Sequence, residues 1–103
     1  MLTELLGSVG VKVRNLIVDY HDKNMEPLHR AMQIPDRGVT DDVIIAAAAR
    51  HYFKQKGYDV YSIIEVLGDY TLADLRAIAD DDNYVMLKGQ SKLIYIDPDK
   101  AFI

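Results

Sequence analysis

The sequence has no cysteine and no tryptophan among its 103 residues. Without cysteine, the chain can form no disulfide, offer no thiol nucleophile and hold no iron–sulfur cluster or cysteine-ligated zinc ion. The longest apolar run, Val43 to Ala49, is too short to span a bilayer. No basic segment precedes an apolar one at the N-terminus, so the sequence predicts no signal peptide. These absences fit a cytoplasmic protein, and the cytoplasm is where we expect it.

Positive charge is scarce in the second half of the chain. Residues 1–57 hold eight Lys/Arg and seven Asp/Glu, a net charge of +1, whereas residues 58–103 hold four and nine, a net charge of −5. Together the two halves give the net charge of −4. Non-specific affinity for nucleic acid comes mainly from Lys and Arg side chains that replace counterions at phosphates. The second half therefore lacks what a nucleic-acid backbone requires.

The length and composition indicate one soluble globular domain. Half of the residues are hydrophobic and 27% are charged, which is ordinary for such a protein. No internal repeat, low-complexity stretch or linker divides the chain. We therefore expect residues 1–103 to form a single domain, with a helical N-terminal segment over residues 1–34 and helices plus a β-hairpin over residues 40–97.

The N-terminal segment has apolar residues at helical spacing over its first 20 positions. They are Leu2, Leu5, Leu6, Val9, Val13, Leu16, Ile17 and Tyr20. The spacing predicts a helix, although the β-branched residues of "VKVRNLIVDY" leave a strand over residues 11–20 as the alternative. Pro27 predicts a break near residues 24–26, followed by a short second segment, "EPLHRAMQI", which we place in the helical part. "PDRG" at residues 35–38 predicts a turn.

The clearest element is a helix over "TDDVIIAAAARHYFKQKG". Thr40 is a good N-cap, acidic residues follow it, lysines stand near the other end, and Gly57 can close the helix in a left-handed conformation. The stretch Val43 to Ala49 is apolar on every side. Such a helix is usually central and buried, so we expect this one to be the core of the domain.

The remaining elements resemble the end of a winged helix-turn-helix in their order. Asp59 and Gly68 bound a predicted short helix, and Thr71 caps another that contains residues 72–82. Two β-rich runs, residues 84–88 and 91–96, then flank Gly-Gln and predict a type II′ hairpin. We therefore expect a mainly α fold with a C-terminal β-hairpin, an α+β domain that resembles a winged helix.

Histidines are the natural candidates for chemistry. Glu26-x-x-His29 is half of a carboxylate-bridged di-metal motif, but the only other glutamates are Glu4 and Glu65, and no second copy exists. His51 could act as a base, but the sequence places no nucleophile beside it. We therefore expect no catalytic residue, no metal and no cofactor, and a protein that is not an enzyme.

The helix in the reading position of the expected winged helix is acidic. It carries one arginine, Arg76, against four aspartates: Asp74, Asp80, Asp81 and Asp82. These carboxylates would be repelled by phosphates, so we interpret them as a protein-binding face. The leading hypothesis is a small, non-enzymatic regulatory or adaptor protein that acts by protein–protein binding. Its size and acidity also suit a phage-type inhibitor.

Two alternatives stay open. A DNA-binding winged-helix regulator would use Lys88 and Lys92 of the hairpin together with Arg76. A structural subunit of a larger assembly is the other. Because a long amphipathic helix often pairs with its twin, we also expect a homodimer through residues 1–24.

Overall fold

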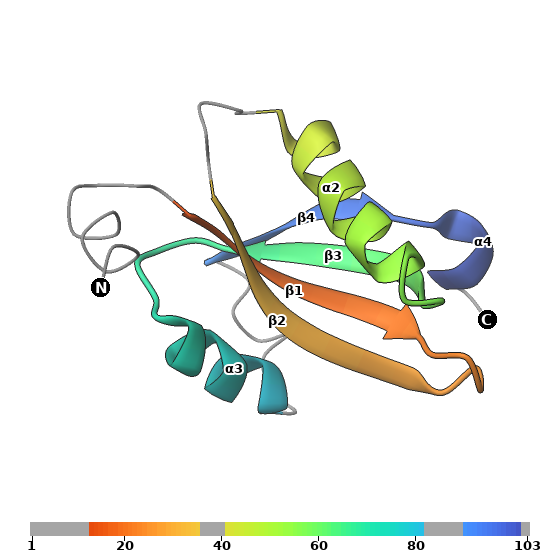
Figure 1. The fold of residues 1–103 in the computed structure, drawn as a ribbon. Helices are drawn as coiled ribbons and strands as arrows, with labels where there is room; N and C mark the ends of the chain where they lie inside the picture. The colour runs from red at the N-terminus through yellow and green to blue at the C-terminus, as the bar shows by residue number, and fades with distance from the viewer. Residues whose placement is uncertain (1–12, 36–40, 82–89, 102–103) are drawn as a thin grey trace.

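The structure, a computed structural model, describes residues 13–35, 41–81 and 90–101. The strands β1 (Val13–His21), β2 (Pro27–Pro35), β3 (Asp59–Val66) and β4 (Ser91–Ile96) form an antiparallel sheet in the order β2-β1-β3-β4. Helix α2 (Asp42–Lys54) lies on one face of the sheet and α3 (Leu72–Asp80) on the other, and the short α4 (Pro98–Ala101) follows β4 (Figure 1). The sheet is thus the middle layer of three.

The expected mainly α, winged-helix-like fold is wrong. Residues 1–34, which we expected to be helical, contain the strand β1 and nearly all of β2. Residues 59–67, where we expected a short helix, contain the strand β3. For residues 11–20, the alternative of a strand is correct from Val13 onward. The expected hairpin partner of residues 91–96, residues 84–88, lies outside the described residues, and within the described part of the sheet β4 pairs with β3.

Strand β1 is central because both of its faces are apolar. It pairs with β2 along one edge, in a register that runs from Val13 opposite Pro35 to His21 opposite Pro27. Along its other edge it pairs with β3. A strand that is covered on both faces needs no alternation of apolar and polar residues. The β1–β2 turn is fixed by Asp22, whose Oδ1 accepts the backbone N–H groups of Asn24 and Glu26.

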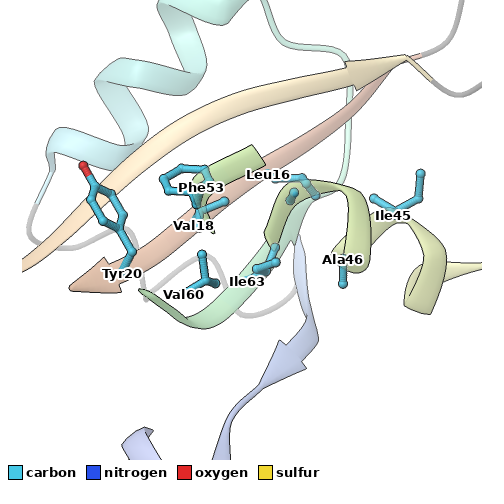
Figure 2. Packing of buried hydrophobic residues seen from close by; sticks show 9 residues of the cluster. Leu16, Val18, Tyr20, Ile45, Ala46, Phe53, Val60 and Ile63 are labelled. Carbon is cyan, nitrogen blue, oxygen red and sulfur yellow. The ribbon is translucent and has the colours of Figure 1, made fainter. Parts of the chain in front are cut away.

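The larger core lies between the sheet and α2. Leu16, Val18 and Tyr20 alternate along β1 and meet the buried side chains of α2, which include Phe53, and those of β3, which include Ile63 (Figure 2). The rings of Tyr20 and Phe53 are 4.9 Å apart, a distance at which tilted aromatic rings attract. This packing fixes α2 to the sheet.

A smaller core lies on the opposite face, beneath α3. Ile17 and Ala31 point to this side of the sheet and pack with Val66 of β3 and with Leu75 and Ala79 of α3. Thr71 begins α3 as its N-cap, because its hydroxyl oxygen accepts the backbone N–H of Asp74 at 3.1 Å. This cap was predicted from the sequence and is confirmed.

Helix α2 was also predicted and is confirmed, with a different cap. Its N-cap is Asp41, whose side chain accepts the N–H of Val43, while Thr40 lies outside the described residues. Gly57 has the expected left-handed backbone, with φ of +80°. The expectation that the whole helix is buried is wrong, because only Ile45, Ala46, Ala49 and Phe53 are buried.

Candidate functional site

The side of α2 that faces away from the sheet is apolar. Val43 is 72% exposed and Ile44 is 54% exposed. Ala47, Ala48 and Tyr52 are exposed as well. We call Val43, Ile44, Ala47, Ala48 and Tyr52 the outer face of α2. No described element lies on that side of the helix (Figure 1).

The composition of α2 explains this surface. Every residue from Val43 to Ala49 is apolar, but the sheet can cover only one side of a helix. A surface helix ordinarily carries polar residues opposite its buried stripe. Here the first two turns carry none. Contiguous exposed apolar residues of this kind mark interaction surfaces more often than scattered ones do.

The two ends of α2 carry opposite charges. Asp41 and Asp42 begin the helix, whereas Arg50, His51 and Lys54 lie near its end. Each sign is placed where the helix dipole favours it. Among the described residues, Asp41 and Lys54 have no ion pair with each other or with a third group. The outer face is thus bounded by an exposed acid and an exposed base.

An ion network fixes the N-terminal end of α2 to the sheet. The guanidinium of Arg14 on β1 donates to both carboxylate oxygens of Glu65 on β3, with Nη2 2.6 Å from Oε1, and also to Asp42 of α2. Lys92 of β4 approaches Asp42 at 3.3 Å and Glu65 at 3.5 Å. The hydrogen bond from Arg14 holds the pKa of Asp42 below its usual range. Four elements thus meet in one cluster of charges.

A groove follows the edge strand β2 between the two helices. Its volume is about 710 Å³, and Tyr52 of α2 lies on one side, with Arg76 and Asp80 of α3 on the other. Edge strands can accept a further strand, but the prolines at both ends of β2, Pro27 and Pro35, restrict such pairing. Tyr52 makes this groove continuous with the outer face of α2.

A second recess lies at the basic end of α2. Its volume is about 350 Å³, and its lining includes the candidate base His51 together with Arg50, Lys54 and Tyr95. The guanidinium carbon of Arg50 lies 4.2 Å from the centre of the Tyr95 ring, and His51 Nε2 lies 3.1 Å from the amide nitrogen of Gln55. No serine or threonine is among the described residues that line the recess, whose hydroxyl groups are those of Tyr58 and Tyr95.

The acidic residues proposed from the sequence lie on or beside α3. Asp74 is in its first turn, Asp80 is its last residue, and Asp81 follows; all three are exposed. Asp82 lies outside the described residues. Asp74 and Asp80 stand at opposite ends of α3, and Asp80 shares the β2 groove with Arg76.

The cations proposed for nucleic-acid binding do not gather in the described structure. Lys92 belongs to the ion network on the α2 side of the sheet, Arg76 lies on α3 beneath the other side, and Lys88 is outside the described residues. Of the half-motif for a di-metal site, Glu26 directly precedes β2 and His29 is the third residue of that strand, so neither lies on a helix. Among residues 13–35, 41–81 and 90–101, no group of three or more metal-binding side chains is arranged to hold an ion.

The outer face of α2 was missed in the sequence. The apolar stretch from Val43 to Ala49 was interpreted as evidence of burial on all sides, and nothing within this stretch distinguishes its inner side from its outer side. A signal existed elsewhere, because the β-branched content of residues 11–20 indicated a sheet, and a sheet covers one side of a helix only.

Comparison with known proteins gives no relative. No family model, curated protein or solved structure matches this chain. None of the helices in the described part of the chain is long and apolar enough to cross a membrane.

Proposed function

We propose that this chain is a small, non-enzymatic regulatory or adaptor protein that acts by binding protein, and that the outer face of α2 is its contact surface. The observation that carries the proposal is the exposure of Val43 and Ile44 on a helix whose first two turns have no polar side. We also propose that it acts in the cytoplasm, a location with which the absence of cysteine is compatible.

The energetic reason is the apolar area that a partner would cover. Complete burial of a valine or isoleucine side chain contributes about 1.5–3 kcal/mol. Val43 and Ile44 are more than half exposed, so a partner would gain about half of that amount or more from each. Ala47 and Ala48 add little area themselves, but their small side chains let another backbone approach closely. An aromatic residue at the margin, Tyr52, is of a type enriched at interfaces.

The acidic residues of α3 would form a separate contact. Asp74 and Asp80 belong to the helix on the opposite face of the sheet from α2. A single flat partner could not cover both helices at once. An adaptor with two partners could use the two helices independently.

DNA binding receives no support from the described residues. Arg76 shares a groove with the carboxylate of Asp80, and Lys92 lies within reach of the carboxylates of Asp42 and Glu65. A phosphate would have to compete with these acids for each cation. No observation favours this function over protein binding.

Photo-crosslinking tests the proposal. A photoreactive amino acid replaces Ile44 in the full chain, and in a second protein it replaces Asp74 of the separate α3 contact. In a matched control it replaces Met25, which is 68% exposed and lies in neither proposed contact. Each protein is irradiated in extracts of the source cell and then analysed by mass. We expect a discrete protein adduct from position 44. Excess unlabelled chain should suppress this adduct when the partner is a different protein, and should itself be found in the adduct when the partner is a second copy.

An absence of any protein adduct from position 44, in extract and in the concentrated pure chain, would overturn the proposal. Adducts at position 74 alone would move the contact to α3. The Ile44→Glu variant provides a second check, because acids are favoured in the first turn of a helix and the domain should therefore keep its fold. This variant should lose the partner while its far-UV circular dichroism stays unchanged.

A further inference from the structure

We infer that the outer face of α2 binds a second copy of this chain, so that two α2 helices pack antiparallel about a twofold axis near Ala47 and Ala48. The inference rests on the proposed function and specifies the partner. The contact lies on a different surface from the homodimer that we expected through residues 1–24. That expectation required an exposed helix, whereas Val13–His21 form a central strand.

Charge complementarity is the first reason for choosing a second copy. Antiparallel packing places the acidic start of each helix beside the basic end of the other. With the axis between positions 47 and 48, Asp41 of one copy lies at the height of Lys54 of the other. Both side chains are exposed, and within the described residues neither has an ion pair. The helix dipoles also align favourably in this arrangement.

Side-chain size is the second reason. A twofold contact brings each residue near the axis against itself or its neighbour, so the centre of the contact must be small or self-complementary. Ala47 and Ala48 meet this requirement. The larger Ile44 then lies at the height of His51 of the partner, where its methyl groups can pack against the imidazole. One surface can thus supply both halves of the interface.

Rigidity is the third reason. Asp42 is held by Arg14, and Phe53 is completely buried against the sheet, so both ends of the helix are fixed. The outer face is therefore presented in one conformation before binding, which lowers the entropic cost of association.

Single cysteines provide a test of the arrangement, because the chain has none of its own. Under mild oxidation, Ala48→Cys should form a disulfide-linked dimer alone. Val43→Cys and Lys54→Cys should each fail alone, since the two copies of position 43 lie roughly 13 Å apart along the helix axis. A mixture of these two variants should crosslink. In parallel packing, Val43→Cys and Lys54→Cys would each crosslink alone and their mixture would give no mixed dimer. If none of these variants forms a crosslink, alone or mixed, the contact is excluded.

Sedimentation of the full chain over a range of concentrations tests the association itself. We expect a monomer–dimer equilibrium that Ile44→Glu shifts towards monomer by about tenfold or more in Kd. The matched control is Met25→Asp, which makes the same change in charge at a residue that is 68% exposed in the β1–β2 turn. This control should leave the equilibrium nearly unchanged.

Asp41→Asn and Lys54→Gln test the charge contact separately. Asparagine preserves the helix cap and glutamine preserves the helix propensity, so neither variant should unfold α2. Each should weaken the dimer less at high salt than at low salt, and together they should weaken it by less than the product of the single effects.

Three outcomes test this inference and the proposed function separately. A monomer at every concentration, with a crosslink from position 44 to a different protein, overturns the second copy and leaves the proposed function standing. A monomer without any such crosslink overturns both. A dimer that Ile44→Glu does not weaken places self-association on another surface and also overturns the inference.

Discussion

Replacing Arg14 by methionine should destabilise the domain strongly, although Arg14 is not in contact with the proposed binding surface. The Arg14 side chain is 10% exposed and joins Glu65, which is 8% exposed, to Asp42 at the start of α2. Methionine has a similar length and can occupy the same space. The substitution therefore removes the positive charge and the hydrogen bonds of Arg14 but keeps most of its packing contacts.

The magnitude follows from the charge that would be left behind. Removal of one partner from a buried ion pair costs about 3–5 kcal/mol, because the other charge remains buried without compensation. Lys92 stays 3.5 Å from Glu65, but its side chain is 45% exposed, so we expect it to offset only about 1 kcal/mol. The net loss should be about 2–4 kcal/mol. For a domain of this size, that loss lowers Tm by roughly 10–25 °C.

Urea denaturation followed by far-UV circular dichroism measures this loss. The double variant Arg14→Met with Glu65→Leu is the matched control, because it removes both buried charges and keeps apolar volume in their place. It should recover most of the stability that the single variant loses. Lys92→Met, which removes only the exposed partner, should cost less than about 1 kcal/mol.

Two results would refute this reasoning. A loss of less than about 1 kcal/mol for Arg14→Met would show that Glu65 is solvated or protonated without its partner. Additive losses for Arg14→Met and Glu65→Leu in the double variant would show that the two side chains do not stabilise one another.

Further predictions concern pH and backbone conformation. The pKa of Asp42 lies below its ordinary 3.8, chiefly because of the hydrogen bond from Arg14. The ionised Asp42 should therefore stabilise the fold above pH 3.8, and this stabilisation should be lost as the pH falls through the pKa of the native state. Asp42→Asn should make the urea midpoint depend less on pH in this acid range. Burial, and secondarily the charge of Asp19, raise the pKa of Tyr61 above 10.0. The neutral Tyr61 should therefore add to the free energy of unfolding below pH 10.0, and this stabilisation should be lost as the pH rises through the pKa of the native state. Titration of phenolate absorbance should then show that Tyr61→Phe removes a late-ionising group; an unchanged late phase would contradict this. Gly68 has φ of +128°, and a Cβ there would lie 3.0 Å from the Tyr70 ring, so Gly68→Ala should cost about 1–3 kcal/mol in urea denaturation, whereas an unchanged midpoint would show that the loop relaxes freely.

The helices could be predicted from the sequence more readily than the strands. Thr71 provides a local signal for the start of α3, and Gly57 provides one for the end of α2; both signals depend only on nearby backbone. Strand β1 carries only its β-branched content as a local signal and shows no alternation, because its consecutive apolar residues Leu16, Ile17 and Val18 belong to two cores on opposite faces. Consecutive burial of this kind imitates one side of a helix, and only the position of β1 between two strands decides the matter.

The binding surface depends on the same tertiary information. The apolar residues of α2 divide into an inner side with Ile45 and Ala49 and an outer side with Ile44 and Ala48, although the sequence gives the two sides the same chemistry. Only the sheet distinguishes them. Conversely, the acidic character of α3 was visible in the sequence, but the separation of Arg76 from Lys92 on opposite sides of the sheet was not.

Thiol reactivity at position 44 tests most directly whether protein covers the outer face of α2. The chain has no cysteine, so Ile44→Cys gives one reactive group, and Met25→Cys gives a control that is similarly exposed. Each is labelled with a maleimide in the dilute pure chain, in the concentrated pure chain and in cell extract. We predict that position 44 reacts several-fold more slowly in the concentrated chain or the extract, while position 25 reacts at the same rate throughout. Equal rates at position 44 under all three conditions would contradict the proposed contact surface.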